Sequence, residues 1–396
     1  MVSPALSILG VLVLLGAVYL ATDPLNYSPI KGLEIHVQEV TVPSSEVLDA
    51  IPRDEENKLR SSEIKFGGQI FGPESVTFDA QGRGPYAGVG DGRIMRWDGD
   101  EKEWVEFAVV IPNRTEVCDQ PQPLAANIKY EHLCGRPLGL RFNKQTGDLY
   151  IADAYFGILK VGPQGGVAEL LTNTADDGKK LLFTNDLDIG DDGAVYFTDS
   201  SSKYRRKNFL LPILEAERGG RLLKWDPKTK ETTVLVRDLL FPNGVTFSKD
   251  KSFLVIAETG TGSLDRYWMK GPKAGTFEHF VWLAGYPDNV RTNEKGEFWV
   301  ALHCRRTVLD MFFKPRPALK HAFLKLPITA RYMYTLFSGT PHAALYKYNE
   351  QGELLEVLED QTGSVVKLVS EPEEHDGKLY LGSVLLPHVA VYTLPK

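Results

Sequence analysis

The chain has 396 residues, of which 43% are hydrophobic and 24% are charged, as in an ordinary globular protein. Its net charge of −7 argues against a nucleic-acid binder, which usually presents a net basic face, so we expect no nucleic-acid partner. The length would allow two or three average domains, but all-β toroids of this size are often one domain.

The first 22 residues contain no charged side chain. The apolar stretch from Ala5 to Ala21 lies at the short end of the roughly 17–25 residues that span a bilayer. A cleaved signal peptide has a shorter apolar core, and cleavage after Ala21 would place Tyr19 where a small residue is needed. Residues 1–22 therefore favour an uncleaved signal anchor over a signal peptide. Either one predicts a location in the secretory pathway: the endoplasmic reticulum lumen, the vacuole or the cell exterior.

Residues 23–65 are polar and rich in charge, which predicts a linker with one strand over 34–40. Glycosylation acceptor triplets begin at Asn26 and Asn113, and both agree with a lumenal compartment, although such triplets also arise by chance. Cys118 and Cys134 flank a stretch with Pro and Asn, and a disulfide between them would close a short loop and leave Cys304 free. The alternative is three reduced thiols, and only the N-terminal segment argues against it.

From about Phe71 onward, a short β-rich run recurs six times. Each copy follows a turn and reaches a small residue, often with an acid after it. A further strand of alternating character follows each copy, for example 93–97, 221–225 and 344–348. Repetition of this unit at a period of roughly 45–80 residues is typical of propeller blades. Residues 66–396 therefore predict an all-β, six-bladed β-propeller and not an ordinary sandwich. The six runs cover 85–91, 148–153, 194–199, 253–258, 297–302 and 378–383.

Before each run lies another short strand, which we expect to be the innermost of its blade. Inner strands surround the channel of a propeller, so their starts converge on one end of it. Five of these starts align, and four of them carry oxygen-bearing side chains: Glu74, Asn185, Asn243, Asp288 and Asn289. Two carboxylates and three amides suit a hard cation, and Ca²⁺ is the expected metal. The alternative is that Asn and Asp stand at these positions because they form turns.

Two long insertions, 200–219 and 303–341, follow the second strands of their blades. Because neighbouring strands are antiparallel, the end of a second strand lies on the same face as the start of the inner strand. We therefore expect helical insertions over the channel mouth, as a lid or a specificity wall. A helical hairpin packed on the rim and contact with the lumenal membrane leaflet are the alternatives. His303 ends its strand on this face and is a candidate catalytic base, or else a structural histidine.

Much of the chain from Gly72 onward resembles the plant strictosidine-synthase-like proteins and their animal counterpart, the adipocyte plasma membrane-associated protein. This resemblance also implies a six-bladed propeller. The matching stretches are 72–75, 134–139, 147–155, 196–201, 241–244, 267–275 and 287–289.

The family name implies a Pictet–Spengler condensation of tryptamine with secologanin. The true synthases carry a catalytic glutamate four residues before a Glu-His-Asp-Gly motif, which stands at 374–377 in this chain. The corresponding position is Ser370, and the adjacent Glu371 is one residue out of step. A shift of one residue in a strand points a side chain to the other face, unless a local bulge restores it.

The distantly similar calcium-dependent hydrolases, paraoxonases and senescence-marker lactonases, carry Glu, Asn, Asn and Asp at the strand starts. Glu74, Asn185, Asn243 and Asp288 match that pattern, and Asn289 matches the paraoxonases further. Leu138 stands where the paraoxonases place a histidine.

The leading hypothesis is therefore a Ca²⁺-dependent hydrolase of small-molecule aryl esters or lactones. The metal would polarise the carbonyl, and His303 or a metal-bound carboxylate such as Asp288 would assist the attacking water. A Pictet–Spengler-type synthase that uses Glu371 is one alternative. The other is a non-enzymatic, membrane-anchored binding propeller in which the metal is structural.

Overall fold

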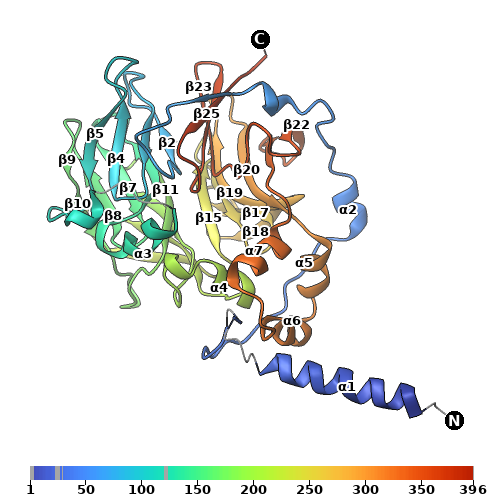
Figure 1. The fold of residues 1–396 in the computed structure, drawn as a ribbon. Helices are drawn as coiled ribbons and strands as arrows, with labels where there is room; N and C mark the ends of the chain where they lie inside the picture. The colour runs from blue at the N-terminus through green and yellow to red at the C-terminus, as the bar shows by residue number, and fades with distance from the viewer. Residues whose placement is uncertain (1–3, 23–26, 29, 120–123, 396) are drawn as a thin grey trace.

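The computed structural model describes residues 4–22, 27–28, 30–119 and 124–395. Six β-sheets make up the body of the protein and form the six blades of a β-propeller, which confirms the predicted fold (Figure 1). In blades 1 to 5 the chain winds from the channel outward, so that the first strand of a blade is the innermost. The predicted β-rich runs are the second strands. They read as continuous apolar runs because neighbouring blades cover both faces, and β7, β12 and β16 are buried along their whole length.

The strands of each blade have the following bounds. Blade 1 has β2 (Val76–Thr77), β3 (Tyr86–Gly88), β4 (Arg93–Trp97) and β5 (Trp104–Val109), with β9 (Gly166–Val167) paired parallel at its outer edge. Blade 2 has β6 (Pro137–Phe142), β7 (Leu149–Asp153), β8 (Gly157–Val161) and β10 (Glu169–Thr172), and blade 3 has β11 (Thr184–Ile189), β12 (Val195–Asp199), β13 (Gly220–Trp225) and β14 (Thr232–Leu239). Blade 4 has β15 (Pro242–Phe247), β16 (Phe253–Glu258), β17 (Ser263–Trp268) and β18 (Phe277–Trp282), and blade 5 has β19 (Gly285–Thr292), β20 (Phe298–Arg305), β21 (Ala343–Tyr348) and β22 (Leu354–Asp360).

Blade 6 is built from both ends of the propeller sequence. It consists of β23 (Glu371–His375), β24 (Lys378–Gly382) and β25 (Val389–Thr393), with β1 (Glu63–Lys65) as its outer strand. β1 pairs antiparallel with β25, with Glu63 opposite Val391. The strand predicted over 34–40 is therefore wrong, and the strand of this region lies at β1. The 34–40 segment is not a strand because its backbone bonds to helical segments, with Gln38 N–H donating to Glu215 O over 2.8 Å.

The inner strands of blades 2 to 5 share a local irregularity near their starts. Their register against the second strand shifts between Pro137 and Gly139, Thr184 and Leu187, Pro242 and Val245, and Pro287 and Val290. A bulge of this kind adds one residue and lets successive side chains point to the same side. Glycine relieves the crowding in one of them, because a Cβ on Gly244 would lie 2.6 Å from Asn289 Cα.

Helical segments cover one end of the propeller, as Figure 1 shows for α4 to α7. The insertion at 200–219 contains η3 (Arg206–Asn208) and α4 (Leu210–Glu215). The second insertion contains α5 (Val308–Phe313), α6 (Pro317–Leu324) and α7 (Ala330–Ser338). We call these two insertions the cap. Their apolar core is shared with the N-terminal segment and includes Ile30, Ile35, Leu214, Leu324 and Met333.

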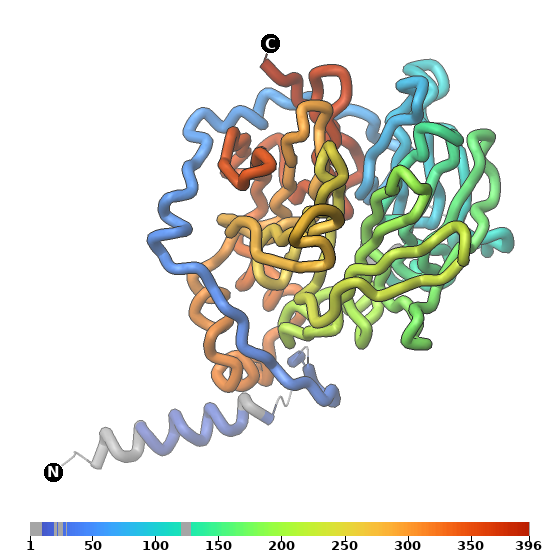
Figure 2. The backbone as a smooth tube through the Cα atoms, turned by 180° about the vertical axis from the view of Figure 1, so that it is seen from behind, coloured from blue at the N-terminus to red at the C-terminus, as the bar shows by residue number. Residues whose placement is uncertain are grey.

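The remaining helices are α1 (Pro4–Ala21), α2 (Ser45–Asp49), η1 (Lys58–Ser61), η2 (Glu116–Cys118) and α3 (Leu124–Cys134). Residues 10–19 of α1 are exposed. Within the residues that the structure describes, no helix has both the length and the apolar character of a membrane span. The signal anchor thus stays a prediction. Figure 2 shows the N-terminal segment running from α1 along the outside of the propeller toward β1.

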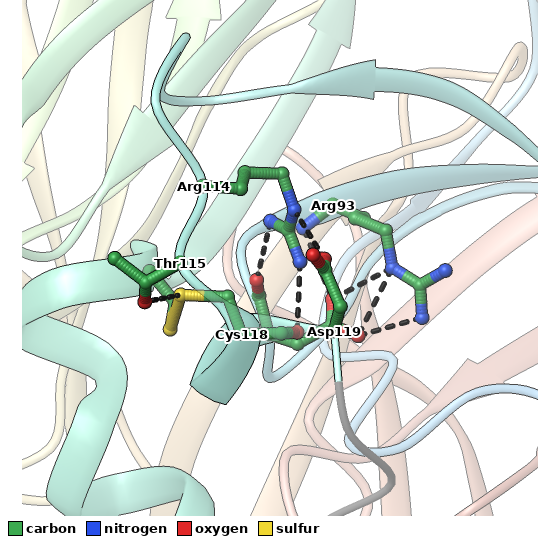
Figure 3. The surroundings of a disulfide bond; sticks show 7 residues. Arg93, Arg114, Thr115, Cys118 and Asp119 are labelled. Carbon is green, nitrogen blue, oxygen red and sulfur yellow. Dashed lines mark hydrogen bonds and ion pairs between the residues drawn. A yellow bond between two sulfur atoms is a disulfide. The ribbon is translucent and has the colours of Figure 1, made fainter.

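The disulfide prediction is confirmed, since Cys118 and Cys134 are bonded and Cys304 is a buried free thiol. Beside the bond, Arg114 donates hydrogen bonds of 2.8 Å to the carbonyl oxygens of Asp91 and Cys118 (Figure 3). The disulfide thereby ties η2 to the end of α3. Asn113, one predicted glycosylation position, is exposed in the preceding loop, whereas Asn26 lies outside the described residues.

Candidate metal centre at the channel mouth

The five predicted ligands occupy corresponding places at the starts of the inner strands. Glu74 lies two residues before β2, while β11, β15 and β19 carry the other four. All five are buried, with between 1% and 6% of each residue exposed. Asn243 Nδ2 donates to Asp288 Oδ1 over 2.7 Å, which joins two adjacent blades across the channel mouth. Asn185 Nδ2 donates to Ser200 Oγ over 2.9 Å. The structure thus places these side chains at one end of the channel, as the aligned strand starts indicated.

Four oxygen atoms of this set are buried without a hydrogen-bond partner. The amide nitrogens of Asn185 and Asn243 are used as donors, and their carbonyl oxygens are left free. Each such buried acceptor costs about 1–3 kcal/mol, so a cluster of them at one site needs an explanation. A hard cation bound by carbonyl and carboxylate oxygens is the group that fits. The four atoms are Glu74 Oε2, Asn185 Oδ1, Asn243 Oδ1 and Asn289 Oδ1.

The chemistry of this donor set is that of oxygen and not of nitrogen or sulfur. Among the described residues, no group of three or more His, Cys, Asp or Glu side chains could hold a metal ion. A site here therefore depends on its amides, with Glu74 and Asp288 as the two carboxylates. Such a mixed set is typical of Ca²⁺, which accepts neutral carbonyl oxygens beside carboxylates.

Glu74 is held in an unusual electrostatic environment. Burial, and then the charge of Asp288, raise its pKa to about 8, although Arg136 and Arg206 act in the opposite direction. The nearest atoms of the Glu74 carboxylate and the Arg136 guanidinium are 3.7 Å apart. Without a cation, burial therefore favours the neutral form of this carboxyl more than in an exposed glutamate. A bound cation would favour its ionised form and release the proton.

Two buried arginines adjoin the centre, and the sequence interpretation missed both. Arg136 donates to Gly72 O over 2.8 Å, but its Nε and Nη1 are buried without a partner. Glu131 of α3 lies 3.8 Å from Arg136 and 3.7 Å from Arg206, and it accepts a 3.2 Å hydrogen bond from Tyr155 OH. Arg136 begins one of the aligned strand starts, which was a usable signal. Arg206 and Glu131 lie outside the blade repeat, in η3 and α3, where the sequence offered none.

His303 lies between the centre and the cap. Its Nδ1 is 3.5 Å from Asp288 Oδ2, and its Nε2 is 2.7 Å from Tyr334 OH of α7. The side chain is 17% exposed, so it is shielded but reachable. Burial raises the pKa of Tyr334, which keeps its hydroxyl protonated. The structure therefore brings together the two predicted catalytic residues, His303 and Asp288, and adds Tyr334.

A buried apolar cluster lies at the same strand starts. Leu138 packs in a cluster with Phe183 and Phe241, which half-buried Phe209 of the first insertion joins. The ring centroid of Phe209 lies 6.4 Å from that of Tyr334, so the two insertions approach each other beside His303. This arrangement gives the centre an apolar surround that excludes water and strengthens local electrostatics.

A second group of charges lies in the channel, formed by Asp186, Arg291 and Glu371. We call it the ion-pair layer. Arg291 Nη2 donates to Asp186 Oδ1 over 3.0 Å and to Glu371 Oε2 over 2.7 Å, so the guanidinium links blades 3, 5 and 6. Asn289 Nδ2 also donates to Glu371 Oε2 over 2.9 Å. All three charged residues are almost fully buried.

The expected orientation of Glu371 is corrected by this contact. We predicted that its side chain points to the opposite face from a catalytic glutamate unless a bulge restores its direction, yet it lies in the channel without a bulge. The reason is that β23 pairs with β24 without the register shift of the other inner strands, which changes which residues face inward. Burial raises the pKa of Glu371 to about 7, against the lowering effect of Arg291. Ser370 Oγ instead accepts a hydrogen bond from Val384 N over 3.1 Å.

Known proteins similar to this chain fall into one family by sequence. Residues 185–272 match the family model of strictosidine synthase, and residues 55–97 match that of the N-terminal part of strictosidine synthase-like proteins. Strictosidine synthase-like 3 of Arabidopsis thaliana is 52% identical over 395 residues, which is 99% of this chain and 100% of that protein. The adipocyte plasma membrane-associated protein of Rattus norvegicus is 37% identical over 347 residues, or 85% of this chain and 87% of that protein.

Solved structures share the fold at much lower identity. A gluconolactonase from Xanthomonas campestris has a TM-score of 0.54 and 15% identity, with 91% of this chain and 96% of that chain covered. Regucalcin from Agrobacterium tumefaciens, a calcium-binding protein, has a TM-score of 0.52 and 13% identity, with 84% and 93% covered. At these identities the similarity concerns the fold alone.

Proposed function

This chain belongs to the strictosidine synthase-like family, and from that premise we propose that it is a calcium-dependent hydrolase of small-molecule esters or lactones. The observation that carries the proposal is the group of four buried, unpartnered oxygens at the starts of the inner strands. These atoms belong to the same residues that the sequence pattern assigns to a hard cation.

The residues that would hold Ca²⁺ are Glu74, Asn185, Asn243, Asp288 and Asn289. When bound there, the ion would polarise a substrate carbonyl and stabilise negative charge on its oxygen. The protein supplies the rest of the environment. Half-buried Phe209, which packs on the buried Phe183 and Phe241, offers an apolar surface to the acyl or aryl part of an ester.

His303 is the proposed base. Its Nδ1 faces Asp288 and has no hydrogen-bond partner, and its Nε2 faces the Tyr334 hydroxyl. Tyr334 therefore holds the ring in place beside Asp288, and in the proposed reaction the imidazole takes the proton of the attacking water. Nearby, Nη1 of Arg136 is a buried donor without a hydrogen-bond partner and is suited to an anionic oxygen.

The fold adds a weaker support. The similar solved structures include a gluconolactonase and a calcium-binding regucalcin, and we extend the lactone and calcium chemistry of those names to this chain. We also propose a lumenal or extracellular location with residues 1–22 as the anchor. The Cys118–Cys134 disulfide and the exposed acceptor Asn113 support this location, because disulfides persist in oxidising compartments.

The Pictet–Spengler alternative has a specific difficulty. Glu371 lies in the channel, but it has no exposed surface, and both of its oxygens are held by Arg291. A general base must reach a proton of the substrate, and Glu371 would first have to leave this ion pair. The binding-propeller alternative predicts a metal without turnover, and the experiment below separates it from the hydrolase.

The test uses the purified full chain in detergent with a panel of aryl esters and lactones, in Ca²⁺ and then in chelator. We expect hydrolysis that disappears with chelator and returns with Ca²⁺. Asp288→Asn should reduce kcat/KM at least about 100-fold, since it removes a carboxylate from the centre and the partner of His303. Asp376→Asn is the matched control, because the Asp376 side chain is 88% exposed.

Two results would count against the hydrolase. Wild-type hydrolysis by Asp288→Asn would show that the centre takes no part in the reaction. A complete lack of turnover, with Ca²⁺ still raising the melting temperature, would assign the metal a structural role. Binding at 100 times the Kd stabilises the folded state by about 2.7 kcal/mol, so thermal unfolding detects this outcome.

A further inference from the structure

The charges of the cap differ from those of the rest of the protein. Residues 200–219 and 303–341 carry twelve of the 45 Lys and Arg residues but only three of the 52 Asp and Glu residues. Those three acids, Glu215, Glu217 and Asp310, are buried. Every exposed charged side chain of the cap is therefore basic, although the whole chain has a net charge of −7.

Several of these basic side chains have no acidic partner. Among the described residues, none of the following forms an ion pair: Arg205, Lys207, Arg316, Lys325 and Arg331. The guanidinium of Arg316 lies 4.5 Å from the ring centroid of exposed Phe312. Cationic groups beside exposed aromatic rings are typical of surfaces that lie at a membrane interface.

Large apolar side chains are exposed on the same helices. Val308 at the start of α5 is 89% exposed, and Tyr332 of α7 is 68% exposed. Tyr332 and Leu336 stand one turn apart on α7, while Met333 and Phe337 of that helix are buried in the cap core. The helix thus has one apolar face toward the protein and a second set of apolar side chains toward solvent. We call the exposed side of α5, α6 and α7 the cap surface.

The N-terminal segment connects the apolar helix α1 to this cap. Ser28 Oγ donates to Leu324 O over 2.8 Å, and Ile30 and Ile35 are part of the cap core. Ala21 ends α1 only seven residues before Ser28, a distance that the chain can extend to at most about 25 Å. Figures 1 and 2 both show α1 leaving from the end of the propeller that carries α6. The short connection therefore keeps the exposed apolar residues of α1 close to the cap.

We propose that the cap surface docks on a leaflet of anionic phospholipid, with α1 inserted in the same bilayer, so that the channel mouth faces the membrane. Anionic headgroups complement the unpaired basic side chains, and Val308, Phe312 and Tyr332 reach the acyl boundary. A lipid surface accommodates both the cap and the uncovered helix α1. An acidic protein partner bound to the cap would leave α1 exposed. Docking does not depend on the proposed hydrolase activity and is measured without substrate.

The experiment places an environment-sensitive fluorophore on Tyr332→Cys in the full chain, reconstituted into vesicles. The natural free thiol, Cys304, is buried and should not compete for the label. In phosphatidylcholine with 30% phosphatidylserine we expect a blue shift and quenching by nitroxide-labelled lipid. The blue shift and the quenching should both be several-fold smaller in phosphatidylcholine alone. They should also be smaller at 1 M salt, where charges more than about 3 Å apart are screened. The same fluorophore on Gln351→Cys, in the β21–β22 turn at the far end of the propeller, should report water throughout.

A charge-reversal variant sharpens the test. Arg316→Glu, Lys325→Glu and Arg331→Glu together should remove the phosphatidylserine-dependent quenching without loss of the fold, since all three side chains are exposed. Lys228→Glu, Lys249→Glu and Lys295→Glu make the same change of charge at the far end and should leave the quenching unchanged. The proposal is overturned if the Tyr332 position stays in water in both lipids, or if the cap variant docks as well as the control. Salt-sensitive binding of polyglutamate without lipid quenching would also overturn it, in favour of an acidic protein partner.

Discussion

The candidate metal centre and the ion-pair layer lie in one channel and use neighbouring residues of the same strands. On β11, Asn185 belongs to the metal centre and Asp186 to the ion-pair layer. On β19, Asp288 belongs to the metal centre and Arg291 to the ion-pair layer. In the ion-pair layer both carboxylates are paired with one guanidinium, whereas in the metal centre four oxygens have no hydrogen-bond partner. Burial alone thus does not indicate function. Charges that are buried and paired hold the blades together, and oxygens that are buried and unpaired are available to a ligand.

The largest effect on stability should follow from a substitution that breaks the ion-pair layer. Arg291→Met leaves Asp186 and Glu371 buried without a cation, and we expect a loss of about 3–5 kcal/mol in the free energy of unfolding. Chemical denaturation measures this loss. Arg141→Met is the control, because its pair with Glu373 spans 3.9 Å and lies nearer the surface, so less than about 1 kcal/mol should be lost. A change below 1 kcal/mol for Arg291→Met would mean that the layer is not structural.

A smaller effect should appear in the pH dependence of calcium binding at the metal centre. Because Glu74 is protonated below its raised pKa of about 8, calcium must displace a proton there. The apparent affinity should rise by up to tenfold per pH unit from pH 6 to pH 8 and then level off, as titration calorimetry at several pH values would record. In Glu74→Gln the affinity should be lower and nearly independent of pH over this range. An equally steep rise in that variant would assign the proton to another group.

The same shift has a consequence for the metal-free protein. A glutamate whose pKa is raised on folding binds its proton more tightly in the folded state than in the unfolded state. Its contribution to stability is therefore full below the unfolded pKa and declines as pH rises toward about 8. Calcium should offset this decline, so the stabilisation by calcium should grow across the same interval.

The smallest expected effect lies where the cap meets the centre. Tyr334→Phe removes one hydrogen bond to His303, which is worth about 0.5–1.5 kcal/mol. We expect kcat to fall by up to about tenfold with little change in KM, because the ring of His303 loses its orientation and the substrate surface stays the same. Tyr332→Phe on the exposed side of α7 is the matched control. A change in KM alone would instead place Tyr334 in substrate binding.

The sequence allowed a good prediction of whatever repeats from blade to blade. Six similar runs identified the second strands. The aligned strand starts also predicted, from the sequence alone, that Asn243 and Asp288 lie close together. Residues outside the repeat were not predictable in this way, and Glu131, Arg206 and Tyr334 all come from helical segments. The inward position of Glu371 was missed because it depends on the absence of a bulge in β23, which residue counting does not reveal.

The closure of the ring by β1 also affects how the protein is made. β1 pairs with β25, which follows it by more than 320 residues, so the outer strand of blade 6 is synthesised long before the strands that it joins. At about 5–20 residues per second, that wait is on the order of tens of seconds. Throughout it, the edge of every unfinished blade remains open to chaperones and to aggregation. Completion of blade 6 therefore comes late in biogenesis, because only a chain translated through β25 can close the ring.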